Sequence, residues 1–125
     1  MENLTIAATR YTPEVTLKTG GSIAINGKSY PENTFEFYQP VMEWLRAYFD
    51  GNAAAKTRVE MEIVYFNSSS SKLFFDLFDL LEEARQNGHD ITVKWIYDKE
   101  NESAQEAGED FREDFESLQI SLVEK

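Results

Sequence analysis

Four consecutive serines, Ser68–Ser71, are the residues of this chain whose type and spacing most directly suggest chemistry. They follow Asn67 and precede Lys72, in the stretch YFNSSSSK. A hydroxyl at such a junction can cap a helix, act as a nucleophile or accept a phosphate. Each role requires different companion residues and a different position in the fold, so the surrounding elements decide among them.

The serines lie between a predicted strand and a predicted helix. Arg58–Phe66 begins by alternating, with Ile63 and Tyr65 on one face, and ends in an apolar run that predicts a central strand buried on both faces. Leu73–Gln86 carries one broad apolar stripe and predicts a helix. The serines therefore lie at the carboxyl end of a strand and the start of a helix, where open α/β sheets bind ligands and anions.

The rest of the chain completes an α/β pattern in a single predicted domain, residues 1–125. Two alternating runs joined by Gly20–Gly21 predict a hairpin, Asn26–Gly27 a second turn, and Asn33 the cap of a first helix. The other predicted elements are strands at Leu4–Ile6, Glu14–Thr19, Ser22–Asn26, Ile91–Tyr97 and Leu118–Val123, and a third helix over Ala104–Phe115. The order β-β-β-α-β-α-β-α-β predicts a mixed, largely parallel sheet with three helices.

Charge and composition exclude several classes of function. There are 23 acidic and 12 basic residues, a formal net charge of −11, which disfavours nucleic acids and anionic membranes as partners. With no cysteine and a single histidine, His89, we expect no metal site and no cofactor. No apolar run is long enough to span a membrane and no signal-peptide pattern is present, so we expect a cytoplasmic protein.

An enzymatic role for the serines is not supported by companion residues. Ser69–Lys72 fits S-x-x-K and Lys18–Gly20 fits K-T-G, two β-lactamase signatures, but their order is reversed and S-D-N is absent. A catalytic base would have to be His89, which lies more than about 20 Å from Ser68, beyond the far end of the predicted helix. We expect no enzyme; the alternatives are a small hydrolase or anion-binding protein that uses the serine loop, or a plain scaffold subunit whose serines only cap the helix.

Several segments together resemble one family of bacterial proteins. The stretch YFNSSSSKLFFDLFDLLEEA, Tyr65–Ala84, resembles the SiaC family of regulatory phosphoproteins. The family's other hallmarks are similar to TRYTPEV, SYPEN, WIYDKENE and EDFREDF, which occur here in the same order. These segments cover nearly the whole chain, and their combination is more specific than any one of them.

The resemblance implies a non-enzymatic switch with a fold similar to STAS-type anti-sigma-factor antagonists. It implies phosphorylation by a protein kinase, dephosphorylation by a PP2C-type phosphatase, and binding of the unphosphorylated form to a diguanylate cyclase. Activation of that cyclase would raise cyclic di-GMP and favour biofilm or aggregation. The family's acceptor directly follows the asparagine, which implies Ser68 here, with Ser69 and Ser70 as alternatives.

The resemblance also directs attention to the surface around the serines. On a helical wheel Phe75 falls opposite the inward stripe, on the side that carries Asp79. An exposed aromatic beside a phosphorylation site is a candidate partner contact. The residues expected to bind the partner are Asn67, Ser69, Lys72, Phe75 and Asp79.

Overall fold

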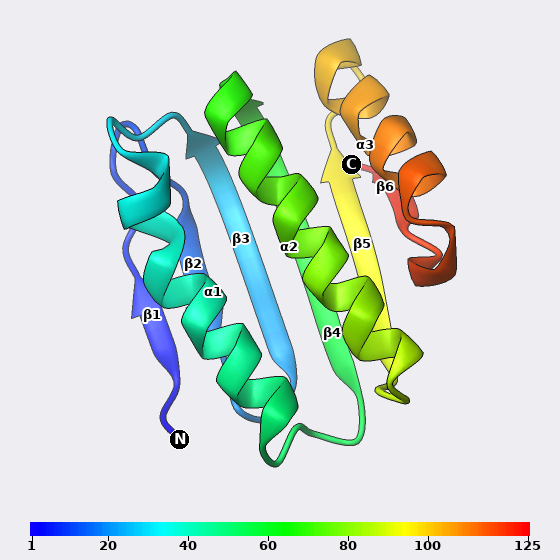
Figure 1. Cartoon of the computed structure of the whole chain (residues 1–125). Coiled ribbons are helices and arrows are strands. Elements are labelled where there is room, and N and C mark those ends of the chain that lie inside the picture. Colours follow the sequence, from blue (N-terminus) through cyan, green and yellow to red (C-terminus); the bar gives the residue numbers. More distant parts are fainter.

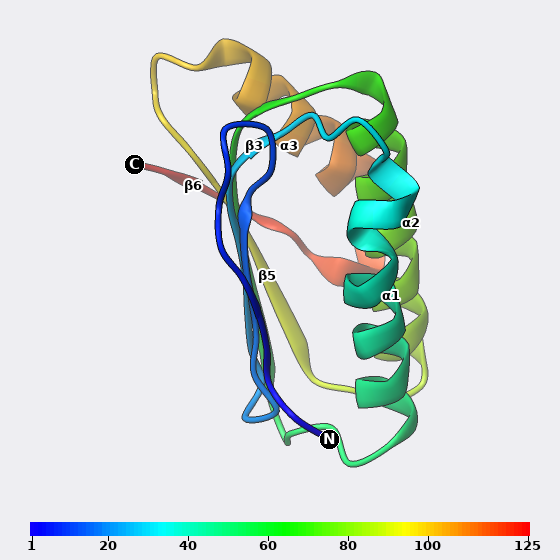
Figure 2. The ribbon, with the colours of Figure 1, turned by 90° about the vertical axis from the view of Figure 1, so that its left-hand side faces the viewer.

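A six-stranded sheet carries all three helices on one of its faces (Figures 1 and 2). The computed structural model describes the whole chain, residues 1–125. The strands are β1 (Leu4–Ile6), β2 (Glu14–Leu17), β3 (Ser22–Ser29), β4 (Thr57–Phe66), β5 (Ile91–Tyr97) and β6 (Ser121–Glu124). The helices are α1 (Thr34–Asp50), α2 (Ser68–Gln86) and α3 (Glu102–Asp114), followed by a 3₁₀ turn over Glu116–Leu118.

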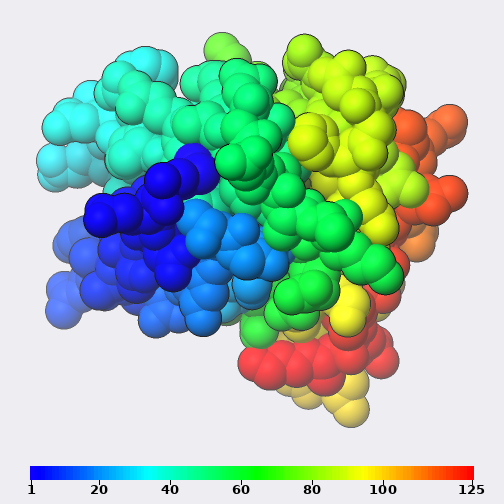
Figure 3. All heavy atoms as spheres, turned by 90° about the horizontal axis from the view of Figure 1, so that it is seen from below, coloured from blue at the N-terminus to red at the C-terminus, as the bar shows by residue number.

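The strands lie in the sheet in the order in which they occur in the chain, β1-β2-β3-β4-β5-β6. The first three pair antiparallel, and β3 to β6 pair parallel. Each connection between parallel strands leads to the neighbouring strand on the same side, from β3 toward β6. Right-handed crossovers therefore place every helix on the same face of the sheet. Viewed from below, the colours accordingly run in order across the molecule (Figure 3). The predicted element order and the mixed, largely parallel sheet are confirmed.

The core lies between the sheet and the helices. Strand residues Val15, Ile25, Met61 and Trp95 are fully buried against this layer. The apolar stripe of α2 faces them, with Phe74 and Phe78 fully buried, as its periodicity predicts. Both aromatic rings pack near the centre of the sheet, and α2 is thereby held between α1 and α3 (Figure 1).

The other face of the sheet is not covered by helices, and the prediction that β4 is buried on both faces is wrong. Val64 is 53% exposed and Tyr65 54% exposed. The continuous apolar run at the end of β4 is typical of strands in parallel sheets that are covered by helices on both faces. Here a single helical layer buries only alternate residues of the strand.

A bulge explains the exposure of Tyr65, which was predicted to share a face with Ile63. Gly27 pairs with Ile63 but Lys28 pairs with Tyr65, so β4 contains one extra residue at this point. A bulge reverses the alternation of side chains beyond it. Tyr65 therefore turns away from the helices and contacts Tyr30, whereas Phe66 turns inward onto Phe74 and Trp95.

Some predicted boundaries also differ from the structure. Asn26–Gly27 is not a turn, because β3 continues to Ser29 and Gly27 lies inside it at a φ of 128°. The last strand begins at Ser121 rather than Leu118, because Leu118 is the last residue of the 3₁₀ turn over Glu116–Leu118. The Gly20–Gly21 hairpin and the Asn33 cap, whose Oδ1 accepts from the N–H of Glu36 at 3.0 Å, are confirmed.

Candidate functional site

The four serines form the first turn of α2. Asn67 is the N-cap residue, and its Oδ1 accepts a hydrogen bond from the N–H of Ser70 at 2.9 Å. The N–H of Ser71 donates to the carbonyl of Asn67, also at 2.9 Å. The helix therefore begins at Ser68, five residues before the predicted start at Leu73. The serines lack the apolar periodicity used to predict the helix, and the cap and the packing of Ser70 hold them in it.

The serines have distinct environments. Ser68 and Ser69 are exposed and Ser71 is half-buried. Ser70 is fully buried, with no exposed surface. In a helix, successive side chains point in directions about 100° apart, so one residue in the first turn faces the sheet while its neighbours face solvent. The run of identical residues thus contains one core hydroxyl and two accessible ones.

The hydroxyl of Ser70 belongs to a buried chain of hydrogen bonds. It donates to the carbonyl of Ser29 at 2.9 Å, and its Oγ lies 2.8 Å from Oγ of Ser29. Oγ of Ser29 also lies 2.5 Å from the hydroxyl of Tyr38. Since Ser70 uses its one proton on the carbonyl, Ser29 must donate to Ser70, and Tyr38 must donate to Ser29. Each of the three hydroxyls then donates once.

This chain joins three elements at the start of α2. Ser29 ends β3, Tyr38 lies in the second turn of α1, and Ser70 lies in the first turn of α2. Burial raises the pKa of Tyr38 to about 12, an effect that its hydrogen bond to Ser29 partly offsets. The N–H of Asn67 also donates to the carbonyl of Ser29 at 3.1 Å. The first turn of α2, including Ser68, is therefore held in a fixed position against the sheet.

A groove between α2 and α3 begins at Ser68. It encloses about 690 Å³. Its lining residues are Phe66, Ser68, Ser71, Lys72, Phe75, Asp76, Ser103, Glu106, Ala107, Asp110, Phe111 and Asp114. Three phenylalanines and Ala107 contribute its apolar surface, and its charged residues are four carboxylates and a single lysine. The groove is consequently acidic, and an added phosphate would increase its negative charge.

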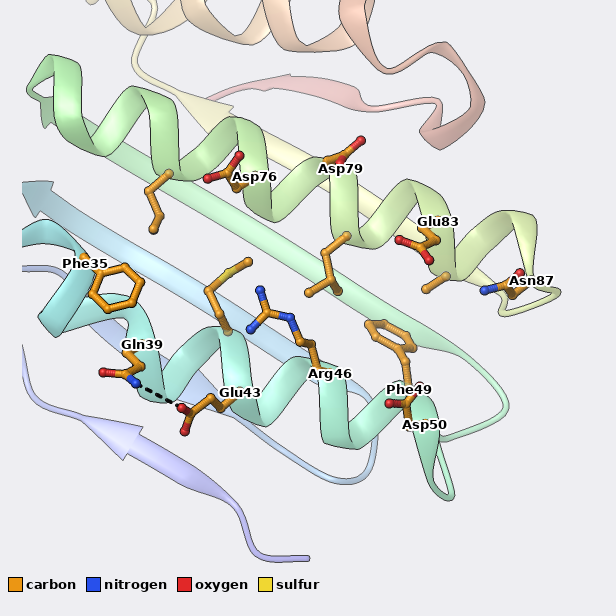
Figure 4. A pocket seen from close by; sticks show the side chains of 14 residues that line it. Phe35, Gln39, Glu43, Arg46, Phe49, Asp50, Asp76, Asp79, Glu83 and Asn87 are labelled. Atoms are coloured by element: carbon orange, nitrogen blue, oxygen red, sulfur yellow. Dashed lines mark hydrogen bonds between the residues drawn. The ribbon is translucent and has the colours of Figure 1, made fainter.

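A second groove runs between α1 and α2 (Figure 4). It encloses about 610 Å³, and Figure 4 shows Arg46 extending from α1 toward α2, which carries Asp79 and Glu83. Gln39 donates to Glu43 on its α1 side at 3.2 Å. This groove is also predominantly acidic, and it lies along the side of α2 that faces α1.

The residues expected to bind a partner are divided between these surfaces. Lys72 and Phe75 line the α2–α3 groove, whereas Asp79 lines the α1–α2 groove. Phe75 is 46% exposed, and its ring packs against Phe115 with centroids 4.8 Å apart. Asn67 serves as the cap, and Ser69 lies exposed beside Ser68. Asp79 therefore does not lie in the same groove as Ser68, Lys72 and Phe75.

Sequence reasoning missed the residues that position the serines. Ser29 and Tyr38 are distant in sequence from Ser70, so no local pattern connects them. It also missed Asn101, whose Nδ2 donates to the carbonyl of Val64 at 3.0 Å while its Oδ1 caps α3. The one available signal was the SYPEN segment, because it begins at Ser29.

Other kinds of site find little support. His89 lies just past the end of α2, where its ring packs 5.0 Å from that of Phe49, at the opposite end of the helix from Ser68. No group of three or more histidine, cysteine, aspartate or glutamate side chains is arranged to hold a metal ion. None of the helices has the length and apolar character needed to cross a membrane.

Comparison with known proteins identifies the family. Residues 6–125 match the sequence model of the SiaC family regulatory phosphoproteins. The chain belongs to the SiaC family. One relative of this chain is an uncharacterized protein of Pseudomonas aeruginosa strain UCBPP-PA14. The two are 37% identical over 116 residues, covering 91% of this chain and 90% of the relative.

Solved SiaC structures match the fold over its whole length. Apo-SiaC from Pseudomonas aeruginosa has a TM-score of 0.91 at 33% identity, covering 98% of this chain and 99% of that one. SiaC in a crystal structure of the diguanylate cyclase SiaD with its activator SiaC, from the same organism, has a TM-score of 0.86 at 35% identity, with coverage of 98% and 99%. The family and the α/β fold expected from the sequence are therefore both confirmed.

Proposed function

We propose that this SiaC family protein is a non-enzymatic switch that binds and activates a diguanylate cyclase when Ser68 is unphosphorylated. The membership of this chain in a family of regulatory phosphoproteins and the solved complex of a relative with the cyclase it activates both support this function. The observation that carries the choice of residue is the contrast between serines. Ser68 is exposed at the head of a groove, whereas Ser70 is enclosed and hydrogen-bonded.

The modification is a reversible phosphoryl transfer. A protein kinase transfers the γ-phosphoryl group of ATP to Oγ of Ser68, forming the O–P bond and releasing ADP and the hydroxyl proton. A PP2C-type phosphatase hydrolyses that bond with water, which releases inorganic phosphate and restores the hydroxyl. The Asn67 cap and the buried Ser70 hold the acceptor in place, so both enzymes meet the same rigid first turn. Ser69 is the remaining accessible alternative, because Ser70 could react only after its hydrogen bonds are broken.

Binding to the diguanylate cyclase of this protein's own host tests the switch. Ser68→Ala should bind and activate the cyclase as the unphosphorylated protein does, and Ser68→Asp should bind at least about tenfold more weakly because it adds negative charge at the groove. Ser22→Ala, which changes an exposed serine at the start of β3, is the control and should not change either measurement. Protein with phosphoserine incorporated at position 68 should bind as weakly as Ser68→Asp or more so.

The binding data can contradict the switch, and peptide mapping can contradict the choice of Ser68 as its acceptor. Equal binding by Ser68→Ala, Ser68→Asp and the phosphoserine protein would leave the serines with a capping role only. Peptide mapping of protein from its own host, with the phosphatase deleted, should locate a phosphate on Ser68. A phosphate found on Ser69 instead would keep the switch and move its acceptor.

A further inference from the structure

Lys72 is the one basic residue that lines the α2–α3 groove. It follows Ser68 by four residues, and side chains at this spacing are neighbours on a helix surface. Both line the same groove. The protein's one ion pair within 4.0 Å joins Lys125 to Glu62, so the ammonium of Lys72 has no carboxylate partner within that distance. Lys72 is thus an unpaired cation next to the proposed acceptor.

The charges that face this lysine are otherwise negative. Asp76 lies on the same helix, and Glu106, Asp110 and Asp114 line the groove from α3. A phosphate on Ser68 would add a charge of about −1.5 to −2 beside these four carboxylates. Like charges in one groove repel, whereas Lys72 is close enough in sequence and orientation to attract the phosphate.

We propose that Lys72 forms an ion pair with the phosphate on Ser68, and that this pair withdraws the only cation of the groove from the partner. The inference rests on the proposed function, because it takes Ser68 as the acceptor. In the unmodified protein, Lys72 is available to a carboxylate of the partner. After modification, the phosphate occupies Lys72 and the groove presents carboxylates alone. A phosphate can then lower partner affinity without any change of fold.

Phosphorus NMR of the protein with phosphoserine incorporated at position 68 tests the ion pair directly. The second ionisation of phosphoserine, ordinarily near pH 6, reports nearby charge. Lys72→Met should raise that pKa by roughly 0.5–1 unit, because the remaining neighbours are carboxylates. Lys72→Arg should keep the wild-type value. Lys94→Met, which removes an exposed lysine from the strand β5, is the control for total charge and should leave the pKa unchanged.

The result that would overturn the ion pair is a titration of Lys72→Met that coincides with that of the wild type. An equal rise in Lys94→Met would also overturn it, because the effect would then be one of net charge. This measurement needs neither kinase nor cyclase. It is therefore independent of whether Ser68 is modified in the cell, and its failure is distinguishable from failure of the proposed function.

Binding to the diguanylate cyclase tests the second half of the inference. Unphosphorylated Lys72→Met should bind the cyclase more weakly than the wild type, since it lacks the cation offered to the partner. Phosphoserine at position 68 should then weaken binding of Lys72→Met by a smaller factor than it weakens the wild type. If phosphorylation lowers both affinities by the same factor, Lys72 does not mediate the switch.

Discussion

At the scale of single residues, one run of serines contains both a buried structural hydroxyl and an exposed hydroxyl that we propose as the phosphate acceptor. Ser70 is buried and completes the hydrogen-bond chain to Ser29 and Tyr38, whereas Ser68 is exposed beside Lys72. A buried hydroxyl whose hydrogen bonds are all made lowers the free energy of unfolding little, whereas a buried hydroxyl without a partner lowers it by the full desolvation penalty. The same residue type can therefore have opposite tolerance to substitution at neighbouring positions.

Substitution of Ser70 tests this separation. Ser70→Ala removes the donor to the carbonyl of Ser29 and the acceptor for the hydroxyl of Ser29. We therefore expect the free energy of unfolding to fall by roughly 1–3 kcal/mol. Urea denaturation measures the change. The control, Ser69→Ala, should stay within about 0.5 kcal/mol of the wild type because the side chain is exposed. Equal losses in the two variants would contradict the role of Ser70.

Tyr38 gives the protein a stability loss at high pH. Its pKa is raised from 10.0 to about 12 by burial, so the folded state favours the neutral phenol. The stability that the neutral, buried phenol contributes is fully present below pH 10.0. It is lost as the pH rises toward 12, because Tyr38 ionises at a lower pH in the unfolded chain than in the folded protein. The loss amounts to about 3 kcal/mol at most.

Comparison with Tyr38→Phe isolates this effect. The variant should be less stable at neutral pH, since the Ser29 hydroxyl loses its donor, but its stability should fall less between pH 10 and 12. Urea denaturation across that range provides the measurement. A wild-type slope that persists unchanged in the variant would assign the loss to other tyrosines.

At the scale of elements, α3 lies unusually close to the sheet at Gly108. An added Cβ there would lie 2.5 Å from both Cδ2 of Leu122 and Cδ1 of Trp95. The indole of Trp95 also donates to the carbonyl of Ala104 at 2.9 Å. This contact fixes the distance of α3 from the sheet, and α3 forms one wall of the groove that begins at Ser68.

Gly108→Ala should destabilise the protein in spite of better helix propensity. Alanine gains up to about 1 kcal/mol in a helix, but overpacking a close contact costs typically 1–3 kcal/mol. We expect a net loss in thermal unfolding, together with a change in tryptophan fluorescence. Gly20→Ala is the control, because a Cβ there meets nothing within 4 Å. Increased stability of Gly108→Ala would contradict the close packing.

The sequence predicted the elements better than the details that build the site. Apolar periodicity predicted α2 from Leu73 onward and its buried face, but not its first turn, which begins at Ser68. The bulge at Val64 could not be predicted, because it depends on how β4 pairs with Gly27 of β3. The partner of Ser70 was equally hidden, since Ser29 lies 41 residues earlier in the chain. Non-local pairings leave no periodic signal in either segment.

At the scale of the whole molecule, negative charge is weakly compensated. The formal net charge is −11, and one ion pair, between Lys125 and Glu62, lies within 4.0 Å. Unpaired like charges on a compact surface repel, and salt screens that repulsion. Both grooves beside α2 contribute carboxylates to this field.

Salt should therefore stabilise the fold. We expect the melting temperature to rise by several degrees between about 0.01 M and 0.5 M sodium chloride, because the Debye length falls from roughly 30 Å to a few ångströms. Calorimetry provides the measurement. A melting temperature that decreases with salt would show that attractive ion pairs dominate the surface instead.

The chain-order arrangement of the strands has a consequence for how the protein is made. Since every strand pairs with the strand before it, each new strand can join the growing edge of the sheet as the chain leaves the ribosome. No later strand has to insert between two earlier ones. The hairpin and α1 can form a template onto which β4 and α2 dock. The helix α2, with the serines in its first turn, would thus be assembled before the last strand has been synthesised.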